Sequence, residues 1–269
     1  MREKDLSTKG SKERRNGISV VCLSALCGKK RIIEYCLGTY NSEREKTLST
    51  KFNLLPILNF LDNLSQNNAK AWFDSHRSDY ETARKIFNDF IDYLIDEFRL
   101  SDNLQALSSK DCVTRIYRDI RFTRDKSPYH ANFSAIIAPG GKKSPEQGYY
   151  VSIQPHDQSM IAGGLHTPTP EQLERFRQSI DRHAGEFKAI TGDSAFVEQF
   201  GKIEGERLKT APKGYDRTHP EIELLQLKQV TALHHVSDQE ILAGDFPEEA
   251  IVVCRAMKPF LNYLDEMLQ

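Results

Sequence analysis

The stretch "GYYVSIQPHDQSMIAGGLH", residues 148–166, holds two short runs rich in strand-forming residues, with His156 and Asp157 between them. Runs of this kind separated by a brief polar turn are typical of a β-hairpin. Two similar runs precede it, at 111–122 and 130–138, and the turn-forming segments "DKSP" and "PGGKKSPEQ" follow them. The pattern predicts an antiparallel meander of four strands in the middle of the chain.

Helical periodicity lies on both sides of this meander. Apolar residues recur every three or four positions over 69–98, which predicts a long amphipathic helix. Thr169 begins a capping-box sequence for another helix, and the last helix is expected over 247–268. Residues 229–236 are a possible further strand. We therefore expect residues 51–269 to form one α+β domain, with a central antiparallel β meander packed by N- and C-terminal helices.

Residues 1–50 differ from the rest of the chain. They hold 11 Lys and Arg against 6 Asp and Glu and show no sustained periodicity. The apolar run 18–27 follows Arg14 and Arg15, as in a signal peptide, but no clear cleavage pattern of small residues follows it. We expect a disordered or non-native N-terminal extension, and a leader, a tail and a start-site artefact all remain open.

Charge and cysteine content exclude several classes of protein. Residues 51–269 carry 26 basic against 32 acidic side chains, and this acidic balance argues against broad nucleic-acid binding. The five cysteines show no CxxC spacing, so neither a disulfide framework nor a zinc site is predicted, and a cytoplasmic location is expected. The histidines and glycines match no metal or nucleotide motif. We expect no metal, no cofactor and no membrane partner.

The run "RIYRDIRFTRDKSPYH", residues 115–130, has four arginines at a spacing of three, Arg115, Arg118, Arg121 and Arg124. Its β-branched and aromatic residues favour a strand over 113–122, although three-residue spacing would also suit a helix. In a strand, one face carries two of the arginines with Tyr117, and the other face is apolar except for Arg118. A guanidinium on an apolar face needs a partner, so we expect Arg118 to be a structural charge held by a carboxylate within the protein.

Positive charge is concentrated around this run. Residues 110–143 hold eight Lys and Arg against three Asp, within an otherwise acidic domain. Such a concentration suits a small anionic or phosphorylated ligand, because arginine offers planar paired donors. The ligand-facing residues would be Arg115, Tyr117, Arg121 and Lys126. The alternative is a solvated sheet face whose arginines pair with Asp119 and Asp125.

A second candidate segment is "APKGYDRTHP", residues 211–220. Lys213 and Tyr215 could bind a ligand, and Asp216 and His219 could transfer protons. The alternative is a tight glycine turn in which Thr218 caps the next helix. The candidates for catalysis are Asp119, Tyr129, Asp216 and His219.

Two long stretches, "FLDNLSQNNAKAWFDSHRSDY" (60–80) and "KDCVTRIYRDIRFTRDKSPYHANFSAIIAPGG" (110–141), resemble a family of uncharacterised microbial proteins, DUF2461. The resemblance covers about residues 52–265 and leaves residues 1–50 outside. It implies a single intracellular domain. It implies no reaction, so no catalytic residue can be carried over from the family.

The function expected from these observations is binding of a small anionic molecule through an arginine-rich sheet face. An enzyme acting on such a molecule is the first alternative. An interaction protein for an acidic partner, or less readily for nucleic acid, is the second. A concave arrangement of the arginines favours a small ligand, whereas a convex one favours a large partner. The oligomeric state does not follow from the sequence.

The weak pattern of residues 1–50 generates a stability prediction. A shortened chain that begins at Lys51 is expected to unfold cooperatively at nearly the melting temperature of the full chain, because the core-forming periodicity begins after that point. Differential scanning calorimetry of both chains measures this. A melting temperature lowered by more than about 5 °C, equivalent to roughly 1 to 2 kcal/mol, would show that the extension stabilises the fold.

Overall fold

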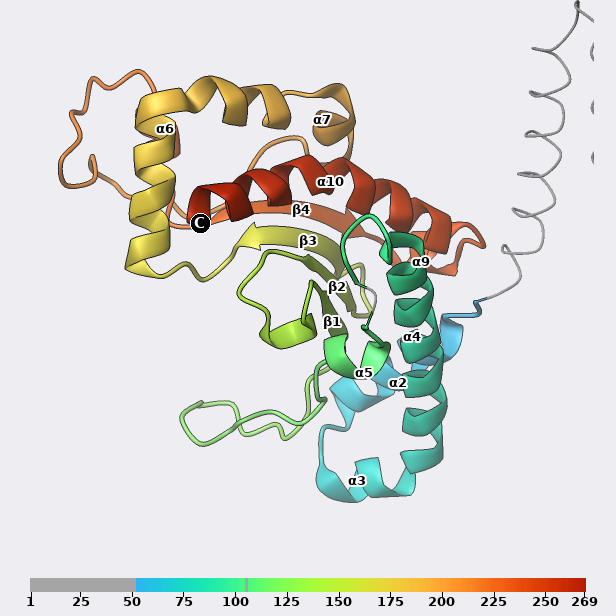
Figure 1. The fold of residues 1–269 in the computed structure, drawn as a ribbon. Coiled ribbons are helices and arrows are strands. Elements are labelled where there is room, and N and C mark those ends of the chain that lie inside the picture. Colours follow the sequence, from blue (N-terminus) through green and yellow to red (C-terminus); the bar gives the residue numbers. More distant parts are fainter. Residues whose placement is uncertain (1–51, 105) are drawn as a thin grey trace, which may run out of the picture. The chain divides into compact units, whose positions relative to one another are not determined.

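Four antiparallel strands form a sheet in the part of the chain that the computed structural model describes, residues 52–104 and 106–269 (Figure 1). They are β1 (Phe133–Ile137), β2 (Tyr149–Ile153), β3 (Ser159–Leu165) and β4 (Val230–Val236), and they lie in that order across the sheet. Val151 of β2 pairs with Ala135 on one side and with Ile161 on the other. The expectation for residues 1–50 lies outside the described residues.

Helices precede and follow the strands, so the predicted α+β class is confirmed. The helices are α2 (Leu55–Gln66), α3 (Lys70–Ser75), α4 (Arg77–Phe98), α5 (Ser109–Cys112), α6 (Pro170–Thr191), α7 (Ser194–Phe200), α8 (Ile222–Leu225), α9 (Asp238–Leu242) and α10 (Phe246–Leu268), with a 3-10 turn, η1, at Gly141–Lys143. None of these helices combines the length and the apolar character needed to cross a bilayer.

Helices α4 and α10 cover one face of the sheet. Alternation along β1 directs Phe133, Ala135 and Ile137 into this layer, where all three are buried. The ring of Phe133 lies 5.6 Å from that of Phe87 on α4. Because the opposite face receives neither helix, its side chains remain partly exposed.

Close contact between α10 and β3 depends on two glycines. A Cβ at Gly163 would lie 2.4 Å from Sδ of Met257 and 2.9 Å from a methyl carbon of Leu261. Gly164 has φ of +108°, and a Cβ there would lie 2.3 Å from the Val230 carbonyl oxygen. The absence of both Cβ atoms therefore lets the helix rest directly on the strand.

The predicted strand over 111–122 is wrong. Its first residues belong to α5, and the rest forms only isolated bridges, at Val113 and Tyr117. The fourth strand of the sheet is instead β4, from the region regarded as a possible further strand. Aspartate is poorly suited to strands, and Asp119 accepts a hydrogen bond from the backbone N–H of Arg121 at 3.2 Å, which replaces a ladder bond.

The helix predicted over 69–98 is interrupted. α3 ends at Ser75 and α4 begins at Arg77, because His76 has φ of −111° and ψ of 26°, outside the helical region. The capping box at Thr169 is present as predicted, with the Thr169 hydroxyl accepting a hydrogen bond from the Gln172 N–H.

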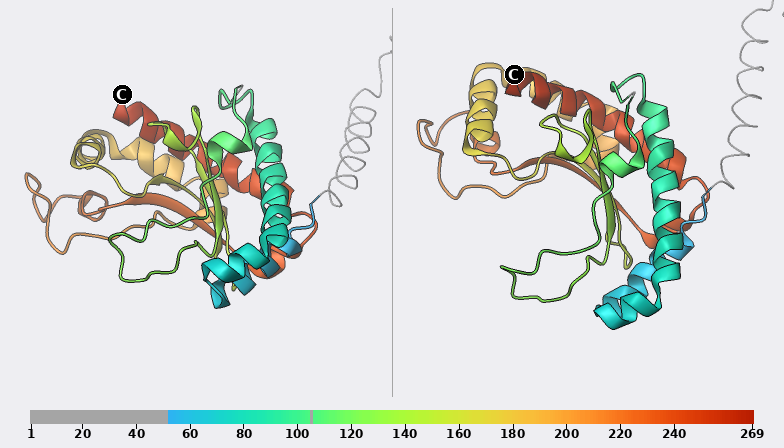
Figure 2. Two further views of the ribbon diagram at one scale, coloured as in Figure 1. Left: turned by 90° about the horizontal axis from the view of Figure 1, so that it is seen from below. Right: turned by 60° about the horizontal axis from the view of Figure 1, so that its bottom comes forward.

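Two long segments without regular structure leave the sheet. Residues 113–132 project beyond β1, and residues 201–221 lie beside α6 at the other end of the molecule (light green and orange in Figure 1). Figure 2 shows that both extend away from α4. The chain segments predicted to bind a ligand are therefore these two segments, and they are well separated.

The α10–β3 contact generates a prediction about stability. Gly164→Ala should destabilise the protein by about 2 kcal/mol or more, because the new methyl group meets backbone and the positive φ is strained. The matched control is Gly185→Ala in α6, where a Cβ meets no atom within 4 Å and the change should stabilise the helix by roughly 0.5–1 kcal/mol. Urea unfolding of both variants measures the difference; equal midpoints would contradict the close packing.

Candidate functional site

The arginine-rich segment forms a projecting two-sided structure, residues 113–130, which we term the basic ribbon. Its two sides and the end of β1 are joined by three backbone hydrogen bonds: Thr114 N–H to Ser134 O (2.8 Å), His130 N–H to Ile116 O (2.8 Å) and Arg118 N–H to Pro128 O (2.9 Å). Beyond Arg118 the sides separate into an exposed tip. The arginines therefore lie on a projection, and the expected arginine-rich sheet face is absent from the described structure.

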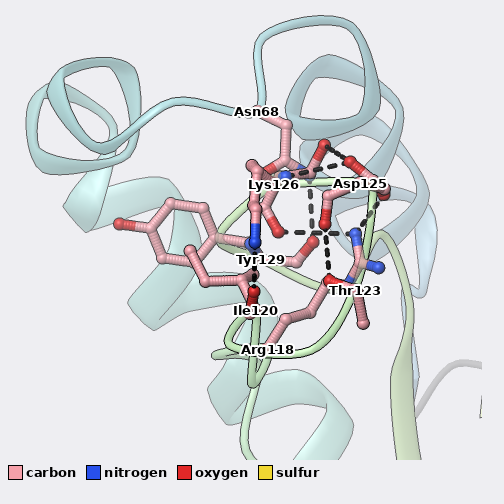
Figure 3. A network of polar contacts seen from close by, with 8 residues as sticks. Asn68, Arg118, Ile120, Thr123, Asp125, Lys126 and Tyr129 are labelled. Atoms are coloured by element: carbon pink, nitrogen blue, oxygen red, sulfur yellow. Dashed lines mark hydrogen bonds and ion pairs between the residues drawn. The ribbon is translucent and has the colours of Figure 1, made fainter.

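Arg118 contacts a carboxylate within the ribbon (Figure 3). Its guanidinium donates a hydrogen bond to Asp125, and only 23% of the Arg118 side chain is exposed. Asp125 also accepts hydrogen bonds from the Ser127 N–H (2.9 Å) and hydroxyl (2.7 Å). The Arg118 hydrogen bond and then those from Ser127 hold the pKa of Asp125 well below its usual range. This network closes the base of the tip.

Other cations predicted to face a ligand are used by the ribbon itself. Arg121 donates two hydrogen bonds to Asp119, at 2.9 and 2.6 Å, and this pairing lowers the pKa of Asp119. Lys126 Nζ donates to the Ile120 carbonyl oxygen at 2.8 Å. Arg115 and Arg124 make no ion pair with any residue in the described ranges, so they are the ribbon cations that remain open to a partner.

Aromatic packing anchors the ribbon to the helical layer. Tyr129 is buried, and its ring stacks on Phe73 of α3 at 4.1 Å. The side chain of Asn68 bonds both backbone groups of Tyr129, at 3.0 and 3.1 Å. Tyr117 lies 5.4 Å from the Tyr129 ring and is 47% exposed. Tyr129 is thus placed as a packing residue, and burial raises the pKa of its hydroxyl.

His130 lies near the guanidinium groups of Arg115 and Arg118 at the base of the ribbon. Partial burial lowers its pKa, and the nearby guanidiniums of Arg118 and Arg115 lower it further. His130 therefore lies in the positive field of the ribbon, although Arg118 itself is paired with Asp125.

In the second predicted segment, residues 211–220, the polar side chains bond mainly to neighbouring residues of the protein. Asp216 accepts hydrogen bonds from the Thr218 N–H (2.7 Å) and hydroxyl (2.6 Å), which lower its pKa. His219 Nε2 lies 3.1 Å from a carboxylate oxygen of Asp181 on α6. Tyr215 packs half-buried, 6.3 Å from the His219 ring, and Lys213 is exposed. Thr218 contacts Asp216 rather than capping α8, whose N-cap position is Glu221.

A cavity lies on the sheet face that α4 and α10 leave uncovered. Its volume is about 960 Å³, and its floor is formed by Ile136, Tyr150, Met160, Ala162 and Leu233. Residues 144–148 form one wall. The opposite wall comes from residues 204–205, which are paired with β4 through the bridge between Glu204 and Thr231. We term this cavity the sheet groove.

The charge of the sheet groove is opposite to that of the ribbon. Its described lining includes two exposed acids, Glu146 and Glu204, together with His166, and includes no lysine or arginine. Neither glutamate makes an ion pair within the described part of the chain. None of the residues predicted for ligand binding or catalysis lines the groove.

The sequences of β2 and β3 contain a signal for the groove. "YYVSI" and "SMIAGGL" place apolar residues on both faces of their strands, as Tyr149 and Tyr150 show. A sheet that is apolar on both faces needs a cover on each side, or it leaves a binding surface. Gly205 is a second signal, since a Cβ there would lie 2.2 Å from the Gln229 carbonyl oxygen.

Metal and thiol chemistry receive no support from the described residues. Within them, no three His, Cys, Asp or Glu side chains are grouped so as to hold a metal ion. Cys112 and Cys254 are buried, and burial raises the pKa of the Cys112 thiol to about 11. A thiol with so high a pKa is a poor nucleophile at neutral pH.

The ribbon network generates a prediction about pH. Arg118→Met should raise the pKa of Asp125 towards the ordinary value of about 3.9, because it removes the main cause of the shift. NMR titration of the carboxyl carbon measures this. The pKa of Asp125 is lower in the folded than in the unfolded protein. Its contribution to the free energy of unfolding is therefore complete above the unfolded pKa, and it is lost as the pH falls through the folded pKa.

The matched control is Arg124→Met, which removes an arginine from the same tip without removing an ion pair in the described structure. It should leave the pKa of Asp125 nearly unchanged. An equal rise in both variants would mean that general positive potential, and not the Arg118 contact, lowers this pKa.

Comparison with known proteins agrees with the resemblance found in the sequence. No curated protein and no solved structure matches the chain. A family model described as conserved hypothetical protein matches residues 56–263, a range that includes the sheet, the basic ribbon and the lining of the sheet groove. On this match over most of its length, the chain belongs to the DUF2461 family of conserved hypothetical proteins.

Proposed function

We propose that this protein binds a ligand in the sheet groove, and that the ligand has an apolar body with neutral or cationic polar groups. The observation that carries the proposal is the cavity of about 960 Å³ on the uncovered sheet face. Binding sites for small molecules are commonly concave, largely apolar and roughly 300–1,000 Å³ in volume.

The floor of the groove favours an apolar body. Ile136, Tyr150, Met160 and Leu233 are only partly buried, although all four lie within strands of the sheet. Covering apolar surface contributes about 25 cal/mol per Å². The Tyr150 hydroxyl can orient a polar group of the ligand, as tyrosine does where an apolar site meets water.

The walls of the groove select against anions. Glu146 and Glu204 contribute negative charge, and no basic residue of the described lining offsets it. A negatively charged group that enters this groove loses hydration and is repelled by the two glutamates. The small anionic ligand inferred from the sequence therefore has no place in the groove, and it is proposed for the basic ribbon instead.

The second candidate function is anion binding by the basic ribbon, favoured by the open side chain of Arg115 and the lowered pKa of His130. Because the ribbon projects from the sheet, its anion belongs more naturally to the surface of a large acidic partner than to an enclosed small molecule (Figure 1). If a free anion binds, phosphate or a nucleotide raises the melting temperature, and an Arg115→Ala, Arg121→Ala double variant loses that rise.

The enzyme alternative has less support. Asp119 and Tyr129 lie in the ribbon, whereas Asp216 and His219 lie in the segment beside α6, and Figure 1 shows these segments apart. Asp119 is paired with Arg121, and Asp216 is bonded within its own turn. A proton-transfer pair needs its members within reach of one substrate.

The groove proposal is tested with Nile red, a neutral fluorescent dye. The dye should bind saturably to the full chain, and Ala162→Phe should weaken binding at least tenfold, because the ring occupies the floor of the cavity. The matched control is Ala189→Phe on the exposed side of α6, which should bind the dye like the unaltered chain. Equal binding by both variants, or no saturable binding, would contradict the proposal.

A further inference from the structure

We propose that the sheet groove receives the tip of the basic ribbon from a second copy of this chain, with Phe122 inserted against the apolar floor. The inference rests on the proposed function, since it names a partner for the same groove. Three observations carry it: the exposure of Phe122, the rigidity of the tip and the opposite charges of tip and groove.

Phe122 is the most exposed large apolar residue among the described positions, with 93% of its surface accessible. It lies at the end of a projection where, among the described residues, the Arg121 guanidinium lies over its ring, 5.6 Å from the ring centre. Aromatic side chains seated in a partner's pocket are the residues that contribute most to binding between proteins. Exposure of a phenylalanine at such a position is therefore more consistent with docking than with solvation.

The tip is held in place before any partner binds. Asp125 contacts Arg118 on the other side of the tip, and its carbonyl oxygen accepts a hydrogen bond from the Thr123 hydroxyl at 2.7 Å (Figure 3). Lys126 Nζ bonds the Ile120 carbonyl at 2.8 Å. Residues on both sides of Phe122 are thus fixed, so docking costs little conformational entropy.

Tip and groove complement each other in charge. Next to Phe122, Arg124 carries a positive charge with no ion pair among the described residues. The groove has an apolar floor with unpaired Glu146 and Glu204 on its walls. An aromatic ring beside a guanidinium is a ligand with an apolar body and a cationic group, which is the chemistry that the groove favours.

The tip must come from another copy. The described lining of the groove contains no residue of the ribbon, so a chain does not fill its own groove. The ribbon projects beyond β1 and lies apart from α6 in Figure 1, whereas the groove includes Gln172 at the beginning of α6. Each copy has one tip and one groove, and two copies can therefore exchange tips reciprocally.

Sedimentation velocity of the full chain over a range of concentrations tests the inference. The unaltered chain should self-associate, and Phe122→Ser and Ala162→Phe should each weaken self-association at least tenfold. When the two variants are mixed, the intact tip of the Ala162→Phe copy meets the intact groove of the Phe122→Ser copy. The mixture should therefore associate, although neither variant does so alone.

A second groove variant and a control variant outside both surfaces distinguish loss of the contact from a folding defect. Met160→Lys places a cation in the groove and should repel the tip as effectively as Ala162→Phe blocks it. Leu100→Ser removes an apolar side chain that is 85% exposed, but outside both surfaces, and should leave self-association unchanged.

The result that overturns the inference is a chain that stays monomeric, a Phe122→Ser variant that associates like the unaltered chain, or a mixture that fails to associate. Nile red distinguishes this from failure of the proposed function. Phe122→Ser should bind the dye at least as tightly as the unaltered chain, because its groove is intact and free. Dye binding without tip-dependent association would leave the groove as a ligand site and remove the second copy as its occupant.

Discussion

Direct contact between α10 and β3 is the constraint on which the other features depend. Because Gly163 and Gly164 lack Cβ atoms, Met257, Leu261 and Phe260 of the helix reach the strand backbone. Helices α10 and α4 together cover one face of the sheet. In the connection that returns the chain to β4, helices α6 and α7 pack against α10, so the centre of the other face stays uncovered and its apolar side chains remain accessible. The groove is a consequence of one-sided packing.

The ribbon illustrates how local hydrogen bonds can prevent a strand from forming. Asp119 and Asp125 direct carboxylate oxygens at nearby backbone N–H groups, which then have no need of a ladder partner. Backbone pairing between the two sides of the ribbon stops at the bond from Arg118 to Pro128, and the following residues turn outward. The segment keeps a fixed shape without a core of its own, and this is why Phe122 can be both held and exposed.

Charge is distributed unevenly between these two surfaces. Residues 110–143 hold eight basic and three acidic side chains, whereas residues 51–269 together are acidic. Two of the ribbon cations are neutralised by neighbouring aspartates, and the positive potential that remains is carried by Arg115, Arg124 and Lys126. The groove walls hold unpaired glutamates. Such a separation favours association of unlike surfaces, either between copies of the chain or with a partner, and disfavours capture of an anion by the groove.

Much of the fold follows from the sequence alone, because helix and strand periodicities and capping boxes are local properties of the chain. They correctly predicted the α+β class, three of the four strands and the helix that begins after Thr169. Sequence also located the unusual charge of residues 115–130. Tertiary structure decided what that charge does. The strand propensity of Ile116 and Tyr117 does not show that side-chain hydrogen bonds limit backbone pairing there to isolated bridges. Nor does any spacing in the sequence indicate that Glu146, Tyr150 and Glu204 line the same groove. The groove arises from residues far apart in the chain, brought together only when one face of the sheet is covered and the other is not.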